Sequence, residues 1–479
     1  MGIMGCANLS QNNGDKLINN SAPTGSAMET RTEDDVYRKA PGETGTESGT
    51  PTGAASHTQE QGFIENPTVT PALTQAIIPT LTPTPTLTLT PTFTSTPTFT
   101  PTPTPDTVTI TMVGDILLHD GIEADCLTDS GTYDYTGIFK NIKNYISSFD
   151  IAIVNQEVII GGKELGISGY PKFNADFTLA DAISDAGFDV VLHATNHMLD
   201  KGVTGILNSL NNWKRFPDIN VIGIYETEED YENQILYIKK NGIKIAILNF
   251  SYGTNGQKIP SDATYVAGPL LKNPNDTDYA ECLAKITALL DTAHENADFV
   301  IVCPHWGEQY SLRQNTYQKK WNRIFYEHGV DLVLGCHPHV IQPIVAVDSE
   351  ITTNINKISF DDMAEKTIPS DEMLVYYSIG NFVNWTGDYG EGILKRMVGG
   401  MPEITLTRNE NGDVVIKDFC VTAIVSHVET GKQKVTVYKL SDYTEELAYA
   451  NEIKNRAGCE LTLEFCKELL NSVWGNYWK

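Results

Sequence analysis

Four short polar motifs in this chain each follow directly on an apolar run that is typical of a buried strand. In chain order they are Gly114-Asp115 after VTITMV, Ala194-Thr195-Asn196-His197 after DVVLH, His305-Trp306-Gly307 after DFVIVCP, and His337-Pro338-His339 after GVDLVLGC. In an open α/β sheet the carboxyl ends of successive strands converge on one crevice, where ligands bind. The repetition therefore predicts that side chains far apart in the sequence share a single site.

Apolar runs alternate with helical patterns from Asp106 onward. Strands are expected at 107–113, 150–154, 189–193, 243–249, 298–303, 330–335 and 373–378. Helices are expected near 137–148, 176–186, 202–214, 278–296 and 316–328. Strand then helix, repeated, predicts an α/β layered domain.

The pattern changes after about residue 395. Strands are expected at 403–408, 413–425 and 433–438, because Asn411-Gly412 is a strong hairpin signal between the first two. A final helix is expected over 441–475. We expect a main domain over 106–400, and we expect the segment 401–479 to complete a second sheet or to flank the first.

The first 105 residues have a different composition. Residues 7–77 are rich in Gly, Ser, Thr, Asn and Glu, so we expect them to be disordered. Every even position from Thr80 to Thr104 is threonine, and the interleaved prolines favour an extended stalk over a strand. Ile3-Met4-Gly5-Cys6 resembles a bacterial lipobox, which would make Cys6 a lipid anchor; a chance match is the alternative.

The charge of the chain limits its partners. The formal net charge is −27, from 34 basic and 61 acidic residues. A nucleic-acid partner would need a basic face, so we expect none. An anionic substrate could be held only by local cations, of which a metal ion is the obvious one.

Four histidines lie in the strand-end motifs: His197, His305, His337 and His339. A single histidine beside a strand is usually structural, but four at strand ends, two of them at i,i+2 spacing, favour metal ligands. Asp115, whose alternative role is that of a turn residue, and Glu157 in the run Asn155-Gln156-Glu157 add carboxylates. This set suits Zn, Mn or Fe, and hydrolysis is its usual use.

The motifs together resemble those of a known family. They are VGD ending at Asp115, NQE ending at Glu157, ATNH ending at His197, HWGEQY ending at Tyr310, GCHPHVIQP around His337 and His339, and YSIGNF around Asn381. In this order they look like the signatures of the CapA family, capsule synthesis proteins linked to poly-γ-glutamate. The resemblance runs from about Val108 to Phe382.

The CapA family is similar in turn to the calcineurin-like metallophosphoesterases, which implies an α/β sandwich of two β-sheets flanked by helices. On that analogy Asn196 binds a metal, His197 is a general acid or contacts the leaving group, and His305, His337 and His339 are ligands. Glu157 would replace the bridging aspartate. Those enzymes place a histidine two residues after the first aspartate, where this chain has Leu117. The nearest histidine is His119, so one metal site is better supported than two.

Other residues are candidates for shaping the pocket and binding substrate. Lys172 lies in the segment Tyr170-Pro171-Lys172-Phe173-Asn174, and Tyr310 and Arg313 follow His305. Arginine suits the recognition of carboxylate and phosphate, although Lys172 has the alternative of a solvated loop residue. Ser378 and Asn381 follow the last predicted strand of the main domain and could hydrogen-bond a ligand or satisfy a turn.

The resemblance implies a surface-anchored protein of poly-γ-glutamate capsule synthesis, export or attachment, on the extracellular face of a bacterial membrane. Asp115 and His197 would be catalytic, one or two divalent ions (Zn, Mn or Fe) would be bound, and the reaction would be metal-assisted hydrolysis or transfer. The partners would be poly-γ-glutamate or another anionic cell-envelope polymer and membrane capsule synthase subunits. Two alternatives stay open: a non-catalytic accessory subunit that binds metal or polymer, and a secreted glutamyl hydrolase.

Overall fold

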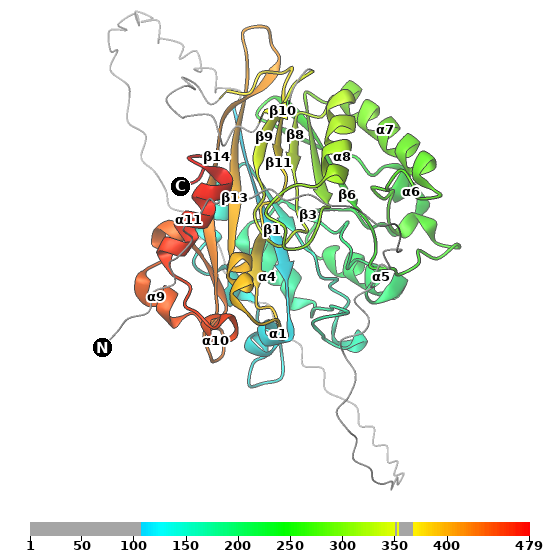
Figure 1. Cartoon of the computed structure of the whole chain (residues 1–479). Coiled ribbons are helices and arrows are strands. Elements are labelled where there is room, and N and C mark those ends of the chain that lie inside the picture. Colours follow the sequence, from blue (N-terminus) through cyan, green and yellow to red (C-terminus); the bar gives the residue numbers. More distant parts are fainter. Residues whose placement is uncertain (1–106, 350–351, 354–366) are drawn as a thin grey trace, which may run out of the picture. The chain divides into compact units, whose positions relative to one another are not determined.

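The computed structural model describes residues 107–349, the backbone of residues 352–353 and residues 367–479. The expectations for residues 1–105, which include the disordered segment, the stalk and the anchor at Cys6, lie outside the described residues. The described chain forms two β-sheets with helices on their outer sides (Figure 1). The predicted fold class, an α/β sandwich of two sheets flanked by helices, is confirmed.

The first sheet has eight strands and is organised around β1. Strands β2, β3 and β4 follow one another in parallel on one side of β1, and β12 also pairs with β1 in parallel. On the other side β13, β14 and β15 continue the sheet in antiparallel order. The bounds are β1 Val108–Leu117, β2 Ile151–Asn155, β3 Val190–Leu192, β4 Asn220–Ile222, β12 Asn381–Asn384, β13 Val398–Arg408, β14 Val414–His427 and β15 Thr436–Lys439. The segment after residue 395 thus extends the first sheet beside β1.

The second sheet has seven strands in the order β10-β9-β11-β8-β7-β6-β5. Its centre, from β6 to β11, is parallel, whereas β5, β9 and β10 are antiparallel to their neighbours. The bounds are β5 Leu236–Lys240, β6 Ile243–Ser251, β7 Phe299–His305, β8 Leu332–Leu334, β9 Ile344–Val347, β10 Thr352–Thr353 and β11 Met373–Tyr376. All seven strands expected before residue 395 are present in the two sheets.

Helices connect the parallel strands, as the alternation predicts. Crossovers run through α4 between β2 and β3, α5 between β3 and β4, α7 between β6 and β7, and α8 between β7 and β8. The helix bounds are α1 Asp120–Cys126, α2 Thr136–Phe139, α3 Lys143–Ile146, α4 Thr178–Ala186, α5 Gly202–Trp213, α6 Glu228–Glu232, α7 Tyr279–Asn296 and α8 Thr316–Glu327. Among the described residues, none of the helices has the length and apolar character needed to span a membrane.

Strand β6 shows how the core is divided. Ile245 and Ile247 belong to the large core that contains side chains of both sheets. The alternate residues Leu248 and Phe250 belong to a second core with buried side chains of α7 and α8. Because successive side chains of a strand point to opposite faces, a strand covered on both faces must be apolar throughout. This is why the central strands read as continuous apolar runs.

The predicted single C-terminal helix over 441–475 is wrong. Three helices stand there: α9 Glu445–Ala450, α10 Lys454–Ala457 and α11 Leu463–Trp474. Gly458 ends α10 in the left-handed region at φ 79°, where glycine is favoured. The Thr462 side chain then accepts a hydrogen bond from Phe465 N at 3.0 Å and begins α11.

Strand β1 continues past its predicted end at residue 113, so Asp115 lies inside the strand. The register shifts on both sides of Asp115, which pairs with Asn155 of β2 and Asn381 of β12. Gly114 permits this because a Cβ at that position would lie 1.8 Å from the Gly380 carbonyl oxygen. Close approach of Gly380, the residue directly before β12, rather than a tight exit from the strand, therefore explains the glycine.

Candidate metal centre

The structure brings the six predicted metal ligands together at the carboxyl ends of strands from both sheets. The first sheet carries Asp115 in β1, Glu157 two residues after β2, and Asn196 in the loop after β3. The second sheet carries His305 as the last residue of β7, and His337 and His339 in the loop after β8. All six are buried, with at most 4% of any residue exposed. Each sheet thus supplies three of them.

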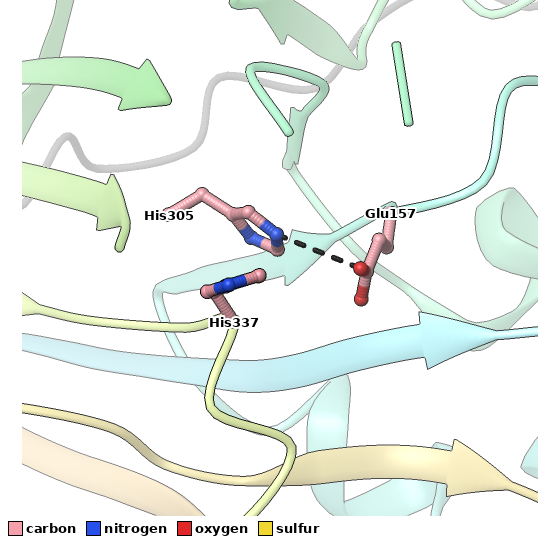
Figure 2. A group of neighbouring side chains, drawn as sticks. All are labelled: Glu157, His305 and His337. Atoms are coloured by element: carbon pink, nitrogen blue, oxygen red, sulfur yellow. Dashed lines mark ion pairs between the residues drawn. The ribbon is translucent and has the colours of Figure 1, made fainter. Parts of the chain in front are cut away.

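One group of ligand atoms lies around Glu157, His305 and His337. Their nearest ligand atoms lie within 4.8 Å of one another, and Figure 2 shows both rings close to the Glu157 carboxylate. His305 Nε2 is 3.5 Å from Glu157 Oε1 and 2.9 Å from Asn196 Oδ1. Ligand atoms about 2.0–2.2 Å from one ion can be up to twice that distance apart, so this group has nearly the spacing of a coordination sphere.

A second group of ligand atoms comprises Asp115, Glu157 and His339, again within 4.8 Å of one another. His339 Nδ1 lies 2.9 Å from Asp115 Oδ2, and His339 Nε2 lies 3.8 Å from Glu157 Oε1. The other oxygen of Asp115 accepts a hydrogen bond from Asn155 Nδ2 at 2.7 Å. Glu157 belongs to both groups and is therefore placed between two candidate ion positions.

The loop after β8 holds its two histidines in an unusual backbone conformation. His337 has φ 98° and His339 has φ 57°, both in the region that side chains other than glycine rarely adopt. Such conformations cost about 1–3 kcal/mol each and persist where the surrounding structure imposes them. Here the result is that both rings lie against the site: His337 is 4.8 Å from the His305 ring, centre to centre, and 5.7 Å from that of His339.

The buried polar atoms of the cluster fit a divalent cation. Both Glu157 carboxylate oxygens and His337 Nδ1 are buried without a hydrogen-bond partner among the described residues. Burial alone would raise the pKa of Glu157, but the charges of His339 and His305 hold that pKa below its ordinary value. Burial would lower the pKa of His339, but the charge of Glu157 and the hydrogen bond to Asp115 raise it. A buried carboxylate with no donor is costly, and a cation is the group that would satisfy it.

His197 lies beside these groups and is held by a residue that the sequence reasoning missed. Its Nδ1 is 2.6 Å from Asp200 Oδ2, and both side chains are nearly fully buried. Asp200 Oδ2 also accepts a hydrogen bond from Phe173 N at 2.7 Å, and the Phe173 ring meets the His197 ring edge-on at 4.7 Å. A histidine with a buried carboxylate on Nδ1 has a fixed tautomer and orientation. The i,i+3 spacing of His197 and Asp200 was the available signal.

The loop after β6 adds two more residues that were not predicted. Tyr252 places its ring 4.5 Å from that of His337. Asn255 Oδ1 accepts a hydrogen bond from Asn196 Nδ2 at 3.0 Å, and its Nδ2 is 3.3 Å from His197 Nε2. The expectation that residues directly after a strand form the site would have pointed to this loop, which follows the predicted strand 243–249. The loop was passed over because its first residues contain no histidine or carboxylate.

The predicted substrate residues fall into two kinds. Lys172 and Arg313 are exposed. Tyr310 is 45% exposed, and its ring lies 6.0 Å from that of His339. Asn381 is buried and bonds inward: Nδ2 donates to the His339 carbonyl at 3.2 Å, and Oδ1 is 3.1 Å from His339 Nδ1. Asn381 therefore orients His339, while Tyr310 lies at the rim.

Ser378 and His119 complete the set of predicted residues. Ser378 Oγ donates to the Val340 carbonyl at 2.8 Å and accepts from Gly380 N at 3.2 Å, which is the turn role considered for it. His119 lies at the start of α1 with its ring 5.3 Å from that of Phe173. Burial and the nearby charge of His339 lower its pKa to about 4, so it is neutral at pH 7.

Comparison with known proteins gives two relatives from Bacillus and several distant structural matches. The capsule biosynthesis protein CapA of Bacillus anthracis is 29% identical over 59% of this chain and 61% of its own length. The PGA biosynthesis protein CapA of Bacillus subtilis is 24% identical over 59% of this chain and 65% of its own length. The match thus spans less than two thirds of either relative.

The structural matches are weak, and one of them serves as an example. The purple acid phosphatase isolated from yellow lupin (Lupinus luteus) seeds superimposes with a TM-score of 0.25 at 10% identity, over 67% of this chain and 55% of that one. A score that low carries no argument about activity. The family model described as bacterial capsule synthesis protein PGA_cap matches residues 109–386, which is more than half of the chain. The chain therefore belongs to this bacterial capsule synthesis protein family.

Proposed function

We propose that this chain acts in the synthesis, export or attachment of a poly-γ-glutamate capsule, through a metal-dependent site that cleaves or transfers an ester or amide bond. Family membership supports the capsule role. The observation that carries the chemistry is Glu157: a buried carboxylate without a hydrogen-bond donor, in reach of His305 at the end of β7 and of His339 in the loop after β8. We also propose that the chain works on the outer face of the membrane beside capsule synthase subunits, with Cys6 as a lipid anchor.

The six buried ligands would hold one or two divalent ions, of which Zn, Mn and Fe suit a mixed nitrogen and oxygen set. When bound, such an ion polarises the scissile bond and activates water. Asn155 and Asn381 keep the ligands in place through hydrogen bonds to Asp115 and close contacts with His339. Preorganised ligands of this kind avoid reorganisation during the reaction.

His197 is the residue that would handle the proton. With Nδ1 engaged by Asp200, the atom left to take or give a proton is Nε2. Asn255 Nδ2, at 3.3 Å, bounds that atom on one side. The His197–Asp200 pair would thus give that proton to the leaving group.

Metal analysis of the purified full chain tests the ligand assignment. Reconstitution with Zn, Mn or Fe should give bound metal that is lost in His305→Ala and His339→Ala. His328→Ala is the matched control, because His328 pairs with Asp291 at 2.6 Å away from the cluster and should leave metal content unchanged. A wild-type chain that retains none of the three metals would contradict the ligand assignment.

Turnover is the second measurement. Metal-loaded chain should cleave either aryl phosphoesters or poly-γ-glutamate, and Asp115→Asn should abolish that activity. Shortening of poly-γ-glutamate without phosphatase activity would identify a glutamyl hydrolase. Tight metal binding without turnover on either substrate would instead favour a non-catalytic accessory subunit.

A further inference from the structure

An arginine that the sequence motifs do not include lies at the rim of the metal centre. Arg396 belongs to the short helix η6 (Glu391–Met397), beyond the residues that match the family model. Its side chain is only 11% exposed. Its guanidinium carbon lies 3.4 Å from the centre of the Tyr310 ring, which is itself next to His339. The arginine is therefore stacked on the residue that lines the entrance.

The backbone of Arg396 is tied to the same site. The Arg396 carbonyl accepts a hydrogen bond from Asn381 Nδ2 at 3.0 Å. The other end of the Asn381 amide is 3.1 Å from His339 Nδ1. Asn381 thus links the backbone of Arg396 to a predicted metal ligand, and the stacking on Tyr310 holds the guanidinium beside that ligand.

The partners of the guanidinium leave part of its binding capacity unused. Nη1 donates to Thr386 Oγ1 at 3.1 Å and to Asp388 Oδ2 at 2.5 Å. Nε is buried and has no hydrogen-bond partner among the described residues. The Asp388 side chain is 58% exposed, and an ion pair with an exposed carboxylate contributes little to stability. A buried donor without a partner is unfavourable, and an anion placed against the guanidinium would satisfy it.

We propose that Arg396, stacked on Tyr310, is an oxyanion-binding subsite that takes a carboxylate of an anionic polymer whose scissile bond lies at the metal centre. This inference rests on the proposed function for the identity of the polymer, poly-γ-glutamate, which carries one free carboxylate per residue. Planar guanidinium matches a carboxylate through two parallel hydrogen bonds, and stacking on an aromatic ring preserves that geometry.

The charge of the chain favours a local cation of this kind beside the metal centre. At a net charge of −27 the protein repels an anionic polymer at long range, and only local cations reverse this. The cations predicted from the sequence, Lys172 and Arg313, are exposed, whereas Arg396 is nearly buried and fixed at the rim. Phosphate shares the chemistry of carboxylate at an arginine, so the two sources are separated by experiment.

The test is calorimetric titration of the full chain, with and without bound metal, using a poly-γ-glutamate oligomer and, separately, inorganic phosphate. Arg396→Ala should weaken binding of the oligomer at least about tenfold, because a charge-assisted pair is lost. Arg396→Lys keeps the charge but loses the two parallel hydrogen bonds, so its affinity for the oligomer should lie between that of the wild type and that of Arg396→Ala. The matched control is Arg215→Ala, since Arg215 also pairs with an aspartate, Asp181, and lies 4.9 Å from an aromatic ring, that of Phe216.

Metal content and melting temperature are measured for every variant, so each outcome has one meaning. Unchanged oligomer affinity in Arg396→Ala, with wild-type metal content, overturns the subsite and leaves the metal assignment intact. A loss confined to phosphate overturns the carboxylate assignment. If Arg396→Ala does not fold, Arg396→Lys decides: affinity equal to that of the wild type overturns the proposal, and a loss supports it. If no metal binds, the proposed function fails, while the metal-free titration still decides the role of Arg396.

Discussion

Two buried glutamates in this molecule have opposite electrostatic surroundings. Glu157 is 0% exposed and lies between His305 and His339 in the metal centre. Glu123, in α1, is 5% exposed, and its Oε2 accepts a hydrogen bond from Tyr135 OH at 2.7 Å. Its other oxygen has no partner among the described residues. Each carboxyl group thus has at least one buried oxygen without a donor, and burial alone does not distinguish them.

Their pKa values move in opposite directions. Burial raises the pKa of Glu123 to about 8, with only Tyr135 acting against it and Asp176 and Asp120 adding to it. At Glu157 burial acts in the same sense, but the surrounding histidine charges outweigh it and lower the pKa. Glu123 is therefore a neutral acid at pH 7, whereas Glu157 stays ionised. A buried carboxyl group therefore indicates a functional site when nearby positive groups keep it charged, as the histidines do for Glu157, and not through burial alone.

The largest expected effect separates the two glutamates by metal binding. Glu157→Gln removes the carboxylate common to both groups of ligands, so metal affinity should fall by at least about a hundredfold, beyond the 10–100-fold typical of outer partners. Glu123→Gln, the matched change, should retain wild-type affinity. Competition with a metallochromic chelator measures both. Equal metal affinities in Glu157→Gln and Glu123→Gln would contradict the assignment of Glu157, and not Glu123, as a metal ligand.

The second effect concerns stability and belongs to Glu123 alone. Because its folded pKa is raised, the neutral form contributes stability that is fully present below about pH 4.5 and is lost as pH rises to about 8. Glu123→Gln should therefore gain stability relative to the wild type across that window, by on the order of a few kcal/mol. Urea unfolding of both proteins at pH 5, 6.5 and 8.5 measures the difference. If the difference in the free energy of unfolding between the two proteins stays constant with pH, the raised pKa of Glu123 is contradicted.

The sequence predicted the central strands well, because these are apolar on both faces and short. It missed the edge strands β4 and β5, since Asn220–Ile222 has only three residues and Leu236–Lys240 ends in two lysines. It also merged three C-terminal helices into one, because the apolar pattern continues through Gly458 where the backbone turns. A helix end of this kind depends on a single residue, whereas a periodic apolar pattern is judged over many residues and does not show it.

The candidate site was predicted in part for a similar reason. Histidines and carboxylates directly after strands are visible one by one, and topology brings them together. Tyr252, Asn255 and Arg396 are ordinary residues in sequence, and only the fold places them beside His337, His197 and Tyr310. Asp200 lies between these cases, because its spacing from His197 is readable but its role depends on burial.

Asp200 offers a third buried carboxylate that sharpens the comparison, since it pairs with one histidine instead of several. Asp200→Asn keeps its shape but removes the charge that fixes the His197 tautomer. We expect turnover to fall by about 10–100-fold, while metal content stays at the wild-type value because His197 is not in either group of ligands. Steady-state kinetics with metal analysis on the same samples measures both. If Asp200→Asn loses metal as well as activity, Asp200 instead helps to hold the metal ligands in place.

The smallest effect tests the one donor that Glu123 has. Tyr135→Phe removes the hydroxyl that donates to Glu123 Oε2 and accepts from Asp176 N at 3.2 Å, so the free energy of unfolding at pH 5 should fall by about 1 kcal/mol. Because that hydrogen bond lowers the pKa of Glu123, its loss should also move the pH window of instability upward. Tyr133→Phe is the control, as its ring stacks on that of Tyr135 at 5.9 Å, and it should change neither quantity. An unmoved window in Tyr135→Phe would mean that burial and the nearby aspartates set the ionisation of Glu123 without the hydroxyl, and the contrast with Glu157 would then rest on the histidines.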